Sequence, residues 1–91
     1  MPTISFFYGI SIRMFFNDHA PPHFHAVHGR DEAKFAIVDG SLISGRMGPK
    51  QRRLVKQWTI MYHVALMRCW NAARADRQPE RIPGLGADND D

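Results

Sequence analysis

Residues 10–17 read ISIRMFFN, and this stretch indicates the fold of the N-terminal half of the chain. Its inward and outward side chains alternate, with Ile10, Ile12, Met14 and Phe16 on one side and Ser11, Arg13, Phe15 and Asn17 on the other. A period of two is typical of a strand with one buried face. Gly9 gives the backbone the freedom for a tight turn, so residues 3–8 are predicted to form the preceding strand.

The next segment contains a proline loop followed by a short strand. Pro21 and Pro22 cannot donate hydrogen bonds to a sheet, so residues 17–22 are predicted to be a loop. The chain then resumes as a strand over residues 23–28. Its alternation places His23, His25 and Val27 on one face, and Phe24, Ala26 and His28 on the other.

The second half changes from strand to helix. Residues 32–38 and 41–46 are predicted to be strands joined by a two-residue turn at Asp39-Gly40. Pro49 suits a helix start, and a helix is predicted over residues 50–75. Its core stripe is Leu54, Trp58, Met61, Ala65, Cys69 and Ala72, with Val55, Tyr62 and Leu66 at its edge. We therefore expect an α+β fold: a four- or five-stranded, mostly antiparallel meander with one long C-terminal helix packed on one face.

Length and charge predict one domain over residues 1–75 and an acidic, mobile tail over residues 76–91. The tail has five acids and two bases, whereas residues 1–75 have ten bases and four acids. The lone Cys69 excludes an internal disulfide and a zinc site built from cysteine pairs. No apolar run is long enough to span a membrane and no secretory signal is visible, so we expect a cytoplasmic protein.

Four of the five histidines lie within ten residues. His23 and His25 share a strand face, and His19 could fold back across the prolines to them. Three imidazoles with an open fourth position are a known zinc arrangement, so His19, His23 and His25 are candidate ligands for zinc or another divalent transition metal. The carboxylates of Asp18, Asp31 and Glu32 could complete or orient the site. The alternative is a set of polar surface residues without a ligand.

The basic residues suggest a nucleic-acid partner. Arg13 and Lys34 are expected beside the histidines on the open sheet face. RNA bases could stack on this face, and RNA phosphates could pair with its cations. The start of the predicted helix is basic, and no acid occurs between Asp39 and Asp76. The candidate nucleic-acid residues are Arg13, His23, His25, Lys34, Arg52, Arg53 and Lys56. The alternative is that these charges serve solubility only.

A second apolar stripe, Ile60, Val64 and Met67, lies opposite the core stripe of the predicted helix. A helix that is apolar on two sides is usually covered on both. The stripe therefore predicts a homodimer or a small protein partner.

The run Asn17-Asp18-His19-Ala20-Pro21-Pro22-His23-Phe24-His25-Ala26, with the preceding strands, resembles a small prokaryotic family, domain of unknown function 4160. The resemblance covers about residues 1–75. It implies a cytoplasmic protein typically encoded beside another short protein, as in toxin–antitoxin modules, and it brings no established activity. The family pattern does not extend to His28, and members usually carry acids where this helix has its apolar stripe.

Three hypotheses follow from these features. The first is a binding or regulatory component of a toxin–antitoxin-like, two-protein module that contacts nucleic acid through a basic, histidine-bearing face. The second is a metal-binding domain with histidine ligands, for which hydrolysis is an option. The third is a protein-interaction module. An enzyme is not favoured, but a hydrolase or nuclease would use His19, His23 and His25.

Overall fold

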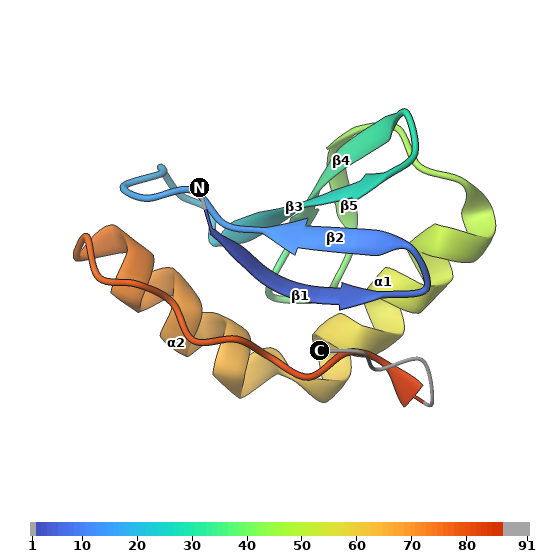
Figure 1. Ribbon diagram of the computed structural model, residues 1–91. Coiled ribbons are helices and arrows are strands. Elements are labelled where there is room, and N and C mark those ends of the chain that lie inside the picture. The colour runs from blue at the N-terminus through green and yellow to red at the C-terminus, as the bar shows by residue number, and fades with distance from the viewer. Residues whose placement is uncertain (1, 87–91) are drawn as a thin grey trace.

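The computed structural model describes residues 2–86 as a five-stranded antiparallel sheet with two helices on one of its faces (Figure 1). The strands are β1 Thr3–Phe7, β2 Ile10–Arg13, β3 His23–His28, β4 Asp31–Ala36 and β5 Leu42–Gly45. Their order in the sheet is β1-β2-β3-β4-β5, which confirms the expected α+β meander. Sequential antiparallel neighbours need only short connections, and this accounts for five strands within 43 residues (3 to 45).

The turn between β1 and β2 agrees with the sequence-based prediction, whereas the connection between β4 and β5 does not. Tyr8 and Gly9 join β1 to β2 with positive φ angles of 49° and 76°, as a two-residue hairpin turn requires. The predicted two-residue turn at Asp39-Gly40 is wrong, because β4 ends at Ala36 and β5 begins at Leu42. The pairing of β4 with β3 continues one residue further, because the Ile37 N–H donates to the Pro22 carbonyl at 3.0 Å, and the connection to β5 therefore spans residues 37–41.

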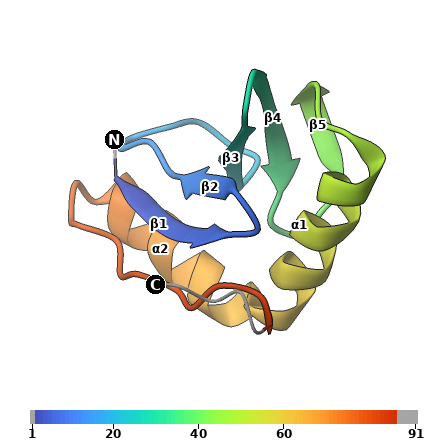
Figure 2. The same cartoon turned by 45° about the vertical axis from the view of Figure 1, so that its right-hand side comes forward.

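The single long helix predicted over residues 50–75 is in fact two helices. These are α1 Pro49–Met61 and α2 His63–Arg74, separated by Tyr62 at φ −113° and ψ 30°. Figure 2 shows the change of direction between them. The Thr59 hydroxyl donates to the Val55 carbonyl at 2.7 Å, a back-bond that often bends helices. Within residues 2–86, no helix is long and apolar enough to cross a membrane.

Trp58 is the centre of the core. Its side chain is fully buried, and its ring centroid lies 5.2 Å from that of Phe7 and 5.6 Å from that of Phe24. The predicted core position of Met61 is wrong, because Met61 is 57% exposed just before the break. The helix residues that are buried are Val55, Trp58, Thr59, Leu66, Cys69, Trp70 and Ala73.

Part of the predicted mobile tail belongs to the folded body. Ile82 and Leu85 are buried, and the Ile82 N–H donates to the Ile4 carbonyl in β1 at 2.7 Å. The Trp58 indole N–H donates to the Pro83 carbonyl at 2.9 Å. Arg68 forms a bidentate pair with Glu80, at 2.9 and 3.0 Å, which ties this segment to α2. Residues 87–91 of that predicted tail lie outside the described residues.

Candidate functional site around His23

The loop between β2 and β3 is fixed at both ends and brings its polar side chains to the start of β3. The Asn17 N–H donates to the Ala73 carbonyl at the end of α2, at 3.0 Å. The Ala20-Pro21 peptide bond is cis, and the Pro22 carbonyl accepts from Ile37. Loop residue Asp18 therefore lies beside the first residues of β3.

His23 is the buried centre of this site. Its side chain is only 2% exposed and packs against Trp70, with ring centroids 5.3 Å apart. Nδ1 lies 2.7 Å from the Pro21 carbonyl oxygen, and Nε2 lies 2.9 Å from Asp18 Oδ2. A carbonyl oxygen can only accept, so Nδ1 carries the proton of that hydrogen bond.

Asp18 is an ionised acceptor in this arrangement. Burial by itself raises the pKa of Asp18, but the backbone N–H of His19 and the charge and hydrogen bond of His23 outweigh it. The pKa of Asp18 is therefore lowered from its ordinary value. One of its oxygens faces His23, and the other accepts from the His19 N–H at 2.9 Å.

His25 shares the strand face with His23 and completes the cluster. Its Nε2 lies 3.8 Å from Asp18 Oδ2, which is beyond hydrogen-bond reach. Nε2 is buried without a hydrogen-bond partner within residues 2–86. Burial lowers the pKa of His25, and the positive charges of His23 and Lys34 lower it further. His25 is therefore a neutral imidazole at pH 7, with the Phe15 ring 4.4 Å away.

The structure brings together two of the three predicted histidine ligands and replaces the third. Asp18, His23 and His25 each place one donor atom within 4.8 Å of the other two. His19 is outside this group: its side chain is 87% exposed, and its Nδ1 lies 3.2 Å from Oδ1 of Asp18, the oxygen that does not face His23. Asp18 had been identified only as a nearby carboxylate, since the sequence does not give the path of the loop. Trp70 packs on His23, and nothing in the sequence located it there.

The predicted nucleic-acid residues lie on two different surfaces. Arg13, His25 and Lys34 are direct neighbours across β2, β3 and β4, on the sheet face turned away from Trp58. This face also carries Glu32, whose carboxylate lies 3.8 Å from His25 Nδ1. The buried His23 is not available to a large ligand.

The remaining predicted residues, Arg52, Arg53 and Lys56, are exposed on α1 together with Lys50. Because α1 packs on the opposite face of the sheet, its cations form a surface separate from the histidines.

Cys69 has no role as a nucleophile in this arrangement. Its side chain is fully buried, and burial raises the pKa of the thiol to about 11. The thiol donates to the Glu80 carbonyl at 3.4 Å. The thiolate, which is the reactive form, is therefore scarce at neutral pH.

Comparison with known proteins gives a family. A family model described as Domain of unknown function (DUF4160) matches residues 9–71, which is more than half of the chain. The matched region contains Asp18, His23 and His25, and it ends just after Trp70. No curated protein and no solved structure matches the chain. The fit of the family model over this length shows that the chain belongs to the DUF4160 family.

Proposed function

We propose that this protein binds the phosphate backbone of nucleic acid through the basic face of α1, as one component of a cytoplasmic two-protein module. The observation that carries the proposal is a group of four exposed cations in the first turns of α1: Lys50, Arg52, Arg53 and Lys56. We call this group the α1 basic face. The toxin–antitoxin-like context rests on the family resemblance alone.

The charge on the α1 basic face is not balanced locally. In residues 2–86 none of its four cations forms an ion pair, and neither α1 nor α2 contains an acid. Asp39, whose pKa is lowered mainly by hydrogen bonds from Ser41 and also by the charge of Lys56, is an acid near this face. The N-terminus of a helix carries a partial positive charge, so cations in its first turn are repelled by the helix dipole. An anionic ligand bound there would offset this repulsion.

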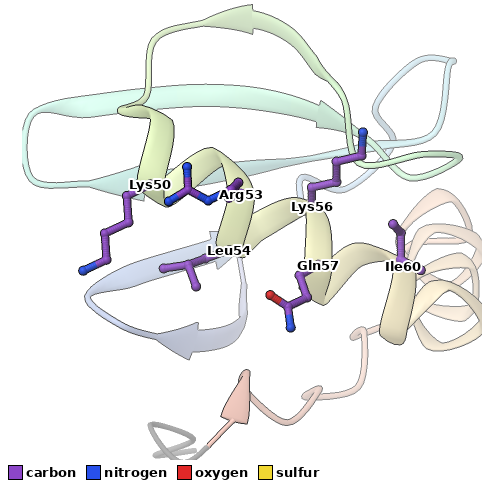
Figure 3. Close-up of a pocket in the computed structure, with 6 residues that line it drawn as sticks. All are labelled: Lys50, Arg53, Leu54, Lys56, Gln57 and Ile60. Carbon is purple, nitrogen blue, oxygen red and sulfur yellow. The ribbon is translucent and has the colours of Figure 1, made fainter.

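The open shape of this surface suits an extended anion better than a small anion that needs an enclosed site. Figure 3 shows Lys50, Arg53 and Lys56 leaving α1 around a groove that Leu54 and Gln57 also line. The groove has a volume of about 430 Å³ and is open to solvent. Flexible cations along an open surface are typical of phosphate contacts that set affinity without reading sequence.

Binding through this face predicts a defined change in salt dependence. The variant Arg52→Ala/Arg53→Ala removes two phosphate contacts, so we expect roughly tenfold weaker binding to a labelled single-stranded oligonucleotide near 0.1 M salt. The slope of log K against log salt should fall by about 1.4 for a single strand. Fluorescence anisotropy across a salt series measures both quantities.

Arg77→Ala/Arg81→Ala is the matched control, because it removes two exposed arginines outside α1. We expect this control to keep the wild-type slope. Equal slopes for both double variants, or no salt-dependent binding by the wild type, would contradict the α1 basic face as the contact.

A protein-interaction module is the second candidate, and an exposed apolar patch favours it. Val38, Ile60 and Val64 are 76%, 63% and 67% exposed. A neighbouring groove of about 390 Å³ is lined by Pro21, Pro22, Val38, His63 and Met67. Of the predicted interface residues, Ile60 and Val64 are exposed, whereas Met67 is partly buried and lines this groove. A second copy or a small partner protein could cover these apolar side chains.

Self-association through this patch is tested by sedimentation equilibrium. We expect the wild type to dimerise at micromolar concentrations and Ile60→Glu/Val64→Glu to remain monomeric, because two charges would be buried. Ile43→Glu is the control, since Ile43 is exposed on β5 outside the patch. A wild-type protein that stays monomeric throughout excludes self-association.

A further inference from the structure

We propose that Asp18, His23 and His25 form a binding site for a divalent transition-metal ion, and that Zn²⁺ suits this ligand set best. The site goes beyond nucleic-acid binding, because it lies at the start of β3 and shares no residue with the α1 basic face.

The three donor atoms of Asp18, His23 and His25 lie within 4.8 Å of one another, so an ion between them would draw the two imidazoles and the carboxylate together. Oδ2 of Asp18 lies 2.9 Å from Nε2 of His23 and 3.8 Å from Nε2 of His25. Zinc bonds of about 2.0–2.2 Å in a tetrahedral arrangement place neighbouring donors about 3.4 Å apart, between these two distances. A shift of a few tenths of an ångström in the Asp18 carboxylate would make the two separations equal.

His23 has the hydrogen bond that orients a metal ligand. Its Nδ1–H donates to the Pro21 carbonyl at 2.7 Å, which fixes the ring and directs Nε2 at Asp18. Metal-bound histidines almost always donate their other ring N–H to a carbonyl or carboxylate in this way. An ion between Nε2 and the carboxylate would take the place of the proton that the two atoms share in the metal-free protein. The burial of His23 against Trp70 holds the ring in one orientation.

A second, independent observation is that Nε2 of His25 has no hydrogen-bond partner in the described residues. The atom is buried, faces the Asp18 carboxylate and has no hydrogen-bond partner in residues 2–86. A buried polar atom without a partner is costly, and native proteins rarely leave one. An ion between the three side chains would accept the lone pair of this nitrogen and explain its position.

The chemistry of the donors selects the kind of ion. Two imidazoles and one carboxylate form a known zinc ligand set that keeps a further position for water. Imidazole nitrogen favours transition metals over Mg²⁺ and Ca²⁺, which prefer oxygen ligands. The side chains of Asp18 and His25 are 18% and 16% exposed, so solvent and an ion can reach the site.

The test uses the full chain without a tag, stripped of metal with a chelator and titrated with Zn²⁺ by calorimetry. We expect one Zn²⁺ per chain, and a loss of affinity of at least about 100-fold in His25→Ala. Asp18→Asn is a second variant, in which the side chain keeps its shape and loses its charge. Zn²⁺ should raise the melting temperature of the wild type and leave that of His25→Ala unchanged.

His28→Ala and His19→Ala are the matched controls. Each removes one imidazole of the same segment that is not among the three ligands, so both should bind Zn²⁺ like the wild type. His28→Ala is the cleaner control, because His19 Nδ1 lies 3.2 Å from Asp18 Oδ1, the oxygen that does not face His23. The proposal is overturned if the wild type binds no Zn²⁺ at micromolar concentrations. It is also overturned if His28→Ala or His19→Ala lowers the affinity as much as His25→Ala does. Nucleic-acid binding by the chelator-treated protein is measured separately, so either proposal can fail alone.

Discussion

Trp58→Ala lowers the free energy of unfolding by about 3–5 kcal/mol, the cost of removing a large buried aromatic side chain. Trp58 is fully buried between Phe7 and Phe24, and its indole N–H holds the Pro83 carbonyl. The substitution therefore removes core packing and releases the C-terminal segment from the body. A domain of this size has a total stability of about 5–14 kcal/mol, so this loss is a large part of it.

Urea denaturation followed by circular dichroism measures this effect. Trp58→Phe keeps an aromatic ring and loses the hydrogen bond, so we expect a smaller loss of about 1–2 kcal/mol that remains measurable if Trp58→Ala does not fold. Met61→Ala is the control on the same helix, and its exposed side chain should change stability by less than about 0.5 kcal/mol. Equal losses for Trp58→Ala and Met61→Ala would support the straight helix that the periodicity predicted and contradict the break at Tyr62.

The fold was predictable where the pattern is local. The strand predicted over residues 10–17 is observed over Ile10–Arg13, and the tight turn predicted at Gly9 is formed by Tyr8 and Gly9. The predicted strand ends early, and Phe16, expected on its inward side, is 39% exposed. The break at Tyr62 is flanked by the hydrogen bond from Thr59 to the Val55 carbonyl and by a contact between His63 and the Ile37 carbonyl, at 3.2 Å. Helical periodicity continues through such a break, so the sequence predicted one helix.

The sequence predicted which types of residue form the candidate site, but not which individual residues do. His23 and His25 share a face because a strand has a period of two, and this needs no tertiary information. Whether His19 or Asp18 reaches them depends on how the loop turns between Asn17 and Pro22, and long-range bonds to α2 and to Ile37 fix that path. The two basic groups were predicted as one surface, because the sequence does not show which side of the sheet α1 covers.

His23→Ala lowers the free energy of unfolding by about 3 kcal/mol, whereas His19→Ala changes it by less than about 0.5 kcal/mol. His23 is 2% exposed and fills the space beside Trp70, while the side chain of His19 is 87% exposed. Removing the His23 ring leaves a cavity and takes the hydrogen-bond partner from both Asp18 and the Pro21 carbonyl. Thermal melts should show a decrease of roughly 12–24 °C for His23→Ala.

His23→Asn separates the two hydrogen bonds of this histidine. An asparagine amide occupies the position of Nδ1, so it can still donate to the Pro21 carbonyl and should recover about 1 kcal/mol relative to alanine. If His23→Ala were as stable as His19→Ala, the burial of His23 against Trp70 would be contradicted. With a chelator present no metal is bound to either variant. The difference in the free energy of unfolding then measures what the His23 side chain contributes to the fold itself. A large loss under these conditions means that the loop and α2 depend on His23 for their packing. His25, whose Nε2 forms no hydrogen bond in the described residues, is then the ligand whose substitution best separates metal binding from folding.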